Sequence, residues 1–318
     1  MRAAASRRRG LVGLACLVCL LAAPCFLLGN PMTQAAKAKA TSVRYEMFGT
    51  QKAEEQHSQQ SNALQTALAP MLLAVLLFGA SSAQAWTHKE SKNWSAEFPM
   101  CKQTSQSPID LTSDTTSGSG STLAQYVKYD PIPARQIKNN GHVMQVDGSF
   151  GAFKLPDGDY QVKQFHFHFP AEHTVDGKLS AGEMHIVHQK VGSSGTDDLA
   201  VIGVILEESK APSKQSSFLQ ALFKDLPEEG SASDVGNVDL NVFGDQFKEF
   251  YHYVGSLTTP PCAEGVHWYV SKNTANVTPE TIKAFHNRFK EDDNRPTQAL
   301  NGRKVVNSAL SVDKEFAA

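Results

Sequence analysis

The sequence predicts a β-rich domain of the α+β class that spans residues 86–318. Short segments with strand-like patterns, separated by turn signals such as Pro156-Asp157-Gly158, outnumber the segments with helical spacing. Residues 199–206 are apolar nearly throughout, which is typical of a central strand buried on both faces. Only two segments have the spacing of short helices. We therefore expect a mixed domain dominated by strands.

The expected strands, in chain order, cover residues 126–132, 142–146, 152–155, 160–169, 182–191, 199–206, 250–255 and 267–271. Asn139-Asn140-Gly141 is a turn signal between the first two of them. The helices are expected at residues 218–226 and 279–289, and Thr278 is the expected N-cap of the second. The strands show no internal repeat, so the elements belong to a single domain.

Three histidines on two of these strands form a candidate metal site. His166 and His168 are one residue apart, so they share one strand face, and the neighbouring phenylalanines take the other. One hairpin could bring His185, from the next strand, beside them, while His188 faces the opposite way. Three neutral imidazoles leave one tetrahedral position of a zinc ion open, as in catalytic zinc sites. A His-x-His pair alone fits two ordinary histidines equally well.

Further short stretches accompany the histidine strands. They are Gln106-Ser107-Pro108-Ile109-Asp110, Asn139-Asn140-Gly141-His142, Ala181-Gly182-Glu183-Met184-His185-Ile186-Val187-His188, Leu199-Ala200-Val201-Ile202-Gly203, Gly255-Ser256-Leu257-Thr258-Thr259-Pro260-Pro261-Cys262 and Asn294-Arg295-Pro296-Thr297-Gln298. In this order, over nearly the whole chain after Trp86, they resemble the α-class carbonic anhydrases. The resemblance implies a large, mostly antiparallel, twisted sheet with short peripheral helices. It also implies reversible hydration of CO₂ to bicarbonate and a proton, by attack of a zinc-bound hydroxide.

The resemblance assigns roles around the zinc. His166, His168 and His185 hold the ion, and the second ring nitrogens of two of them donate to neighbouring side chains. Gln164 and Glu183, each two residues before a ligand, accept the ring N–H of His166 and His185. Without the resemblance, Gln164 and Glu183 read as ordinary polar positions on a strand.

The resemblance also implies how substrate and proton are handled. The hydroxyl of Thr258 donates to Glu172, so it can only accept from the zinc-bound oxygen, and Thr259 contacts bicarbonate. His142 carries protons between the site and the buffer, although alone it reads as a surface turn residue. CO₂ is small and apolar, so the family's pocket is apolar, and the matching positions are Val187, Val201, Leu257, Val266 and Trp268.

The chain departs from the family in its N-terminal aromatic segment. Family members usually have a tyrosine there, whose hydroxyl reaches the water network of the site. Residues 86–100 contain Trp86, Trp94 and Phe98 but no tyrosine. The sequence does not indicate which residue takes its place.

The cysteines divide between two regions. Cys16, Cys19 and Cys25 lie in the predicted N-terminal leader, residues 1–85. Only Cys101 and Cys262 lie in the body of the chain, residues 86–318. Two distant cysteines in an exported domain indicate one disulfide, and the resemblance implies the same pair. Two free buried thiols are the alternative.

Residues 1–85 are predicted to be a cleaved targeting leader with apolar segments at 11–28 and 66–85. Four arginines precede the first segment, and the second ends in Ala83-Gln84-Ala85, a signal-peptidase type of site. Two export signals in series favour the thylakoid lumen of an algal plastid. Secretion from the cell, or one segment retained as a membrane anchor, are the alternatives. Asn93 and Asn276 begin glycosylation sequons that are relevant only on the secretory route.

The distribution of charge limits the partners. The leader holds 8 Lys/Arg against 3 Asp/Glu, which leaves 22 against 29 in the rest of the chain. A mildly acidic body without a basic stripe argues against nucleic acid or an anionic membrane as a partner. The expected partners are therefore CO₂ and bicarbonate, with no stable membrane insertion after removal of the leader.

Two other classes of protein remain to be weighed. A non-catalytic binding or scaffold protein on the same fold would typically lack one or more zinc histidines, yet all three are present. A cupin-like metal oxygenase also uses a His-x-His strand, but it would require iron and a carboxylate ligand. A cupin-like oxygenase would also not account for the stretch Leu257-Thr258-Thr259-Pro260-Pro261.

Overall fold

The computed structural model describes residues 86–112, 116–117 and 120–309. The predicted leader, with its two apolar segments and three cysteines, lies outside the described residues. Within these ranges, no helix has the length and hydropathy needed to cross a bilayer.

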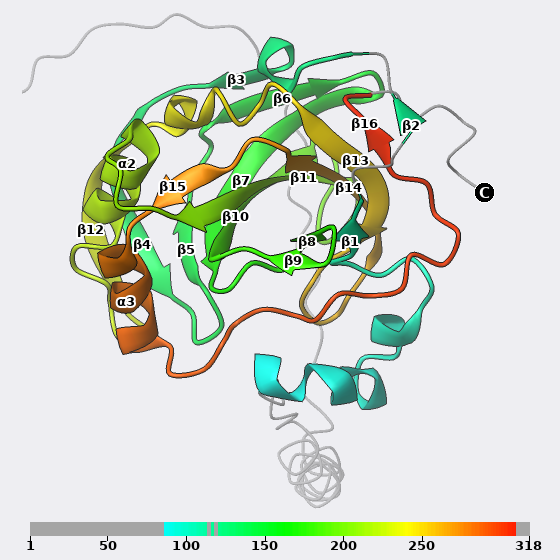
Figure 1. Cartoon of the computed structure of the whole chain (residues 1–318), viewed down its shortest axis with the longest axis horizontal. Helices are drawn as coiled ribbons and strands as arrows, with labels where there is room; N and C mark the ends of the chain where they lie inside the picture. The colour runs from blue at the N-terminus through cyan, green and yellow to red at the C-terminus, as the bar shows by residue number, and fades with distance from the viewer. Residues whose placement is uncertain (1–85, 113–115, 118–119, 310–318) are drawn as a thin grey trace, which may run out of the picture. The chain divides into compact units, whose positions relative to one another are not determined.

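A 13-stranded mixed sheet forms the body of the molecule, and the view in Figure 1 shows its strands curving around the centre of the domain. Its path in space is β12 (Ala232–Val238), β4 (Ile132–Asn139), β5 (Met144–Asp147), β7 (Gly158–His168), β10 (Gly182–Lys190), β11 (Leu199–Glu208), β14 (Glu264–Ser271), β13 (Phe250–Ser256), β16 (Val306–Asn307) and β2 (Thr116–Ser117). Off this path, β15 (Ala275–Val277) pairs with β11, β6 (Gly151–Leu155) with β7, and β3 (Val127–Tyr129) with β6. The β11–β14, β11–β15 and β16–β2 pairs are parallel and the others antiparallel, so the prediction of a mostly antiparallel sheet is confirmed.

Smaller elements surround this sheet. β1 (Asp110–Leu111), β8 (Thr174–Val175) and β9 (Lys178–Leu179) form a separate three-stranded sheet. The described α-helices are α2 (Lys214–Leu222) and α3 (Pro279–Arg288), and short 3-10 helices occur at η1 (His88–Ala96), η2 (Pro99–Lys102), η3 (Leu123–Gln125) and η4 (Leu240–Phe243). The predicted β-rich class with few, short helices is therefore confirmed.

The period of two along the strands divides the apolar residues between two clusters. On β11, Ala200 and Ile202 pack in a large cluster that also contains Phe165 and Phe167 of β7. Val201, between them, packs in a second cluster on the other face. The strands therefore bury one face in the main core and leave the other for the histidines.

Two predicted elements were misplaced. The predicted strand at 126–132 is two strands, because β3 ends at Tyr129 and β4 begins at Ile132, after Pro131, which has no N–H to donate. The first helix begins four residues earlier than expected, because Ser213 caps it by accepting from the backbone N–H of Ser216. Thr278 caps α3 in the same way, as predicted.

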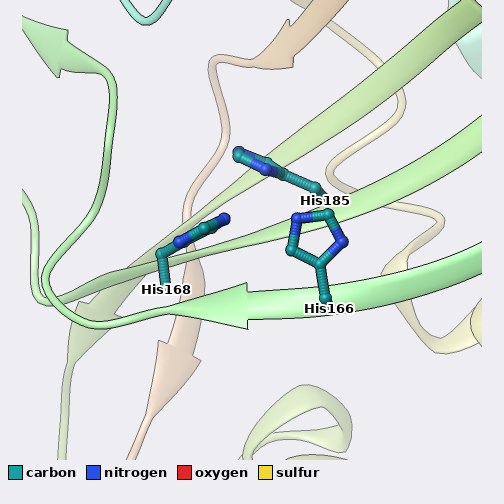
Figure 2. Close-up of side chains that lie close together, drawn as sticks. All are labelled: His166, His168 and His185. Carbon is teal, nitrogen blue, oxygen red and sulfur yellow. The ribbon is translucent and has the colours of Figure 1, made fainter. Parts of the chain in front are cut away.

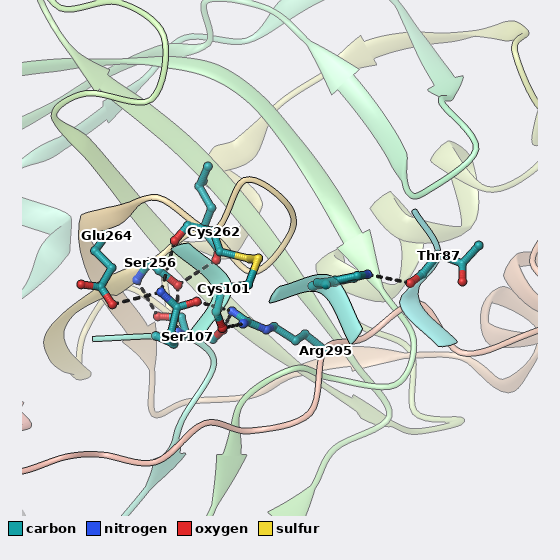
Figure 3. The surroundings of a disulfide bond; sticks show 10 residues. Thr87, Cys101, Ser107, Ser256, Cys262, Glu264 and Arg295 are labelled. Atoms are coloured by element: carbon teal, nitrogen blue, oxygen red, sulfur yellow. Dashed lines mark hydrogen bonds between the residues drawn. A yellow bond between two sulfur atoms is a disulfide. The ribbon is translucent and has the colours of Figure 1, made fainter. Parts of the chain in front are cut away.

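A disulfide joins Cys101 of η2 to Cys262 of the loop between β13 and β14, as predicted (Figure 3). Trp94 packs in the same buried cluster, with Trp86 and Phe98 against it. The guanidinium of the buried Arg295 donates to the carbonyl of Cys101 at 3.0 Å. The N-terminal segment is thus covalently tied to the loop that contains Thr258-Thr259-Pro260-Pro261.

This cross-link predicts a large effect of reduction on stability. It spans 161 residues of sequence. In the chain-entropy model, closing a loop of that size stabilises the fold by up to about 5 kcal/mol. We expect reductant to lower the melting temperature measured by differential scanning calorimetry, and activity to fall before the domain unfolds.

The control is the Cys101→Ser/Cys262→Ser protein. With or without reductant, its melting temperature should equal that of the unsubstituted protein after reduction. An equal shift in the double variant would place the effect of the reductant elsewhere in the chain.

Candidate metal centre

Three histidines converge on one point of the sheet, as Figure 2 shows. In the antiparallel pairing of β7 with β10, His185 lies directly opposite His166, and His168 lies two residues further along β7. One nitrogen from each imidazole lies within 4.8 Å of the others. The strand period and the hairpin therefore bring together the three residues predicted as metal ligands.

The second nitrogen of each ring is held by an acceptor. Nδ1 of His166 donates to Oε1 of Gln164 at 2.8 Å, and Nε2 of His185 donates to Oε1 of Glu183 at 2.9 Å. Nδ1 of His168 donates to the backbone carbonyl of Asp293 at 2.7 Å. These contacts fix the tautomers, so Nε2 of His166, Nε2 of His168 and Nδ1 of His185 carry the free lone pairs.

The donor set suits zinc. Burial lowers the pKa of all three imidazoles, for His168 to about 4, so the rings are neutral near pH 7. Nε2 of His168 is buried and has no hydrogen-bond partner in the described part of the chain. Three uncharged nitrogens with their far sides anchored are the ligand type of a catalytic zinc site.

Glu183 connects the metal site to its surroundings. Its carboxylate is fully buried and accepts from the backbone N–H groups of Glu172 and His173, at 3.0 and 2.8 Å, and from both rings of His173 and His185. Burial alone would raise the pKa of Glu183, but these histidines outweigh it and hold the pKa well below its usual range. Gly203 makes room for the group, since a Cβ there would lie 2.8 Å from Oε1 of Glu183.

Glu172 and Thr258 lie beside the three histidines. Oε1 of Glu172 accepts from the backbone N–H of Arg295 at 2.8 Å, and the carboxylate also accepts from the hydroxyl of Thr258. Its other oxygen is buried, unpartnered among the described residues, and 3.6 Å from Nε2 of His168. Burial raises the pKa of Glu172 to about 7, a shift that a nearby cation would oppose.

The predicted apolar pocket residues fall in one cluster. Val201, Val266 and Trp268 are its buried members, and Val187 and Leu257 pack against it at its partly exposed side. The ring of Trp268 lies 4.8 Å from that of His185. Thr259 is half-buried in the same loop as Leu257 and Thr258. An apolar wall therefore adjoins the histidines on the Thr258 side.

His142 lies at the edge of the site on the turn before β5. The side-chain oxygen of Asn140 accepts from the backbone N–H groups of His142 and Val143, which shapes this turn. The imidazole stacks on Trp86 with ring centroids 3.7 Å apart and planes 7° apart. Partial burial lowers the pKa of His142, and the negative charge of Glu229 opposes the shift without cancelling it.

Sequence reasoning missed three contributors. The carbonyl of Asp293 holds His168, and the main chain of Arg295 holds Glu172, although Asn294-Arg295-Pro296 had no assigned role. The segment without a tyrosine places His88 beside the site, with its ring centroid 6.1 Å from that of His168. A histidine two residues after Trp86, in the segment that lacked the family's tyrosine, was the available signal for His88.

Three other buried histidines have different partners. His173 lies against Glu183 and Tyr253, whereas His188 contacts the hydroxyl of Tyr129 on the opposite face of β10. His252 contacts the carbonyl of Trp268 through Nδ1. None of them shares a donor cluster with both His166 and His168 among the described residues.

The chain is similar in sequence to two named carbonic anhydrases. The chain is 35% identical over 228 residues to alpha carbonic anhydrase 3 of Arabidopsis thaliana, covering 68% of this chain and 80% of that protein. It is 31% identical over 247 residues to carbonic anhydrase 3 of Equus caballus, covering 69% and 95%.

A solved structure agrees with the fold. The α-carbonic anhydrase from Thermovibrio ammonificans, in complex with the inhibitor sulfanilamide, matches with a TM-score of 0.63 and 32% identity, over 70% of this chain and 98% of that one. The model of the eukaryotic-type carbonic anhydrase family matches residues 89–309. The chain therefore belongs to the α-type carbonic anhydrase family.

Proposed function

We propose that this protein catalyses the zinc-dependent, reversible hydration of CO₂ to bicarbonate and a proton. The observation that carries the proposal is the set of three neutral imidazoles, with donor atoms within 4.8 Å of one another and their far nitrogens anchored. Membership of the family supports the same reaction. His166, His168 and His185 would hold the metal.

A bound zinc ion would act as a Lewis acid and lower the pKa of water from roughly 15.7 to about 7, the latter being the figure for carbonic anhydrase itself. The three imidazoles suit this chemistry because they add no negative charge to the site. Gln164 and Glu183 keep the rings of His166 and His185 in the tautomers that offer a lone pair.

Thr258 and Glu172 would control the orientation of the nucleophile. The hydroxyl proton of Thr258 goes to Glu172, so the Thr258 oxygen has only lone pairs to offer to the site. An incoming group must then donate a hydrogen bond to Thr258, which disfavours anions that carry no proton. The backbone N–H of Arg295 fixes Glu172 in this role.

The apolar wall would receive CO₂, which forms few hydrogen bonds and loses little on leaving water. Its position on the Thr258 side matches a path in which substrate arrives beside the oriented nucleophile, with Thr259 next to the product. The wall is formed by Val187, Val201, Leu257, Val266 and Trp268.

His142 would accept the proton that each hydration releases. The ring is partly exposed, and its lowered pKa keeps it neutral and able to accept near pH 7. Because His142 lies at the edge of the site, its ring can pass the proton on to the buffer.

We also propose export to the thylakoid lumen of an algal plastid, with secretion as the alternative. The support is the pair of apolar segments in residues 1–85, together with a disulfide that suits an oxidising compartment. Asn93 is exposed on η1, whereas Asn276 is half-buried in β15. A glycan at Asn93 in protein isolated from its own cells would favour secretion.

The metal site is tested by His185→Ala. We expect loss of zinc, measured by inductively coupled plasma mass spectrometry, together with loss of CO₂ hydration, since two imidazoles cannot hold the ion. The matched control is His188→Gln on the same strand, because His188 faces the opposite side, and it should keep zinc. Full activity in a zinc-free His185→Ala protein would contradict the proposal.

The proton path is tested by His142→Ala. Turnover in weak buffer should fall by roughly 10²-fold, the lower end of the usual range for a positioned acid or base, and added imidazole should restore it. kcat/KM should stay unchanged, because attack on CO₂ precedes proton release. Unchanged turnover at low buffer concentration would reduce His142 to a turn residue.

The surroundings of His142 predict how its pKa responds to substitution. Nuclear magnetic resonance titration should give a midpoint below the ordinary value of 6.5. Trp86→Ala exposes the ring and should raise the pKa, whereas Glu229→Gln removes a charge that favours the imidazolium and should lower it further. Shifts of the same sign in both variants would be incompatible with these causes.

A further inference from the structure

His88 is a buried imidazole beside the metal centre whose role the reaction above leaves unassigned. It is the first residue of η1 and is 8% exposed. The rings of Trp86 and Trp94 contact it edge-on, with centroids 5.2 and 5.9 Å away, and His168 lies 6.1 Å away. Packing alone would suit an apolar ring at this position equally well.

The polar edge of the ring faces the site. Nε2 of His88 is buried and has no hydrogen-bond partner among the described residues. Nε2 of His168 and Oε2 of Glu172 share this property. A buried polar atom without a partner costs about 1–3 kcal/mol. The metal would account for Nε2 of His168 alone, so Nε2 of His88 and Oε2 of Glu172 indicate a further polar partner that is not a side chain.

The distances fit a bridging solvent molecule. Donor atoms of His88, His168 and Glu172 lie within 4.8 Å of one another. A buried water molecule typically makes about three hydrogen bonds, and polar groups too far apart for direct contact are often bridged in this way. Once His168 binds the metal, His88 and Glu172 remain to hold solvent next to it.

His88 and His142 line one cavity, which none of the three metal ligands lines. Its volume is about 310 Å³, and Trp86, His88, His142 and Asp293 are among the residues that line it. Trp86 contacts both imidazoles, stacking on His142 and meeting His88 at its edge. His88 therefore neighbours the metal ligand His168 and shares a cavity with the proton acceptor His142.

We propose that His88 is a positioning residue for proton transfer, whose Nε2 hydrogen-bonds the solvent molecule that links the metal centre to the path toward His142. This rests on the proposed function. A neutral imidazole has one donor and one acceptor, so it can hold such a molecule in one orientation. The segment that lacks the family's tyrosine thus supplies a polar group of different chemistry at the wall of the site.

The first test is His88→Phe, which keeps a ring between Trp86 and Trp94 but removes both nitrogens. Turnover in weak buffer should fall about fivefold, the worth of one hydrogen bond, while kcat/KM and zinc content stay unchanged. His88→Gln, whose amide reaches the position of Nε2, should recover most of the loss. A purely structural His88 would give a Phe variant that behaves as the unsubstituted protein, and that result would overturn the proposal.

Two further variants separate the proton path from general damage. In the His142→Ala background, His88→Phe should add nothing, because both residues serve one path; additive losses would refute the link. His286→Phe on the outer helix α3 is the matched control and should leave turnover unchanged. Melting temperatures of all variants show whether any loss follows unfolding.

A crystal structure of the zinc-loaded protein gives a readout that does not depend on activity. We expect an ordered solvent molecule about 3 Å from Nε2 of His88, absent in His88→Phe. A ring turned away from the cavity, or direct coordination of the metal by His88, would refute the proposal. Absence of zinc and of hydration in the unsubstituted protein would instead refute the proposed function, so the two failures are distinguishable.

Discussion

The register between β7 and β10 is the constraint on which the site depends. His185 pairs with His166, and Glu183 pairs with His168, so ligands and their supporting carboxylate come from one ladder. A slip of one residue would turn His185 into the main core and Met184 or Ile186 toward the metal. The apolar residues prevent the slip, because Phe165, Phe167, Met184 and Ile186 are all fully buried on the far face. The same burial that stabilises the domain therefore sets the geometry of the site.

Hydrogen bonds around this ladder decide which nitrogen of each histidine is free to bind a metal. An imidazole offers a lone pair at either nitrogen, and only an acceptor on one side decides which. The three rings use three kinds of acceptor: the amide of Gln164, the carboxylate of Glu183 and the carbonyl of Asp293. Glu183 also binds two main-chain N–H groups at the segment that carries Glu172. Its charge is therefore compensated where it is buried, and Glu172 is positioned by the same group that orients His185.

Local rules in the sequence predicted much of this. A period of two places His166 and His168 on one face of the strand and the neighbouring phenylalanines on the other, and the structure shows this arrangement. The polar edge strand β12 escaped prediction because its Ser, Asp, Gly and Asn show no apolar alternation. The carbonyl that holds His168 could not be read from the sequence, because every residue has one and only the path of the chain after α3 brings this one near. The place of His88 beside the site is defined by its contact with His168, and spacing in the sequence cannot reveal a contact between residues so far apart in the chain.

The contacts of Arg295 have a consequence for how the chain reaches this structure. Its guanidinium donates to Gln106, Ser107 and Cys101, across sequence separations of 189, 188 and 194 residues. The first segment of the domain can thus form these three hydrogen bonds only after the chain has been synthesised as far as Arg295. Contacts this distant in sequence are slow to form, because the entropy of closing the loop is lost before any contact compensates for it. We therefore expect the wall that carries Trp86 and His88 to assemble late, and a chain truncated before Arg295 to lack three of the hydrogen bonds that hold this segment.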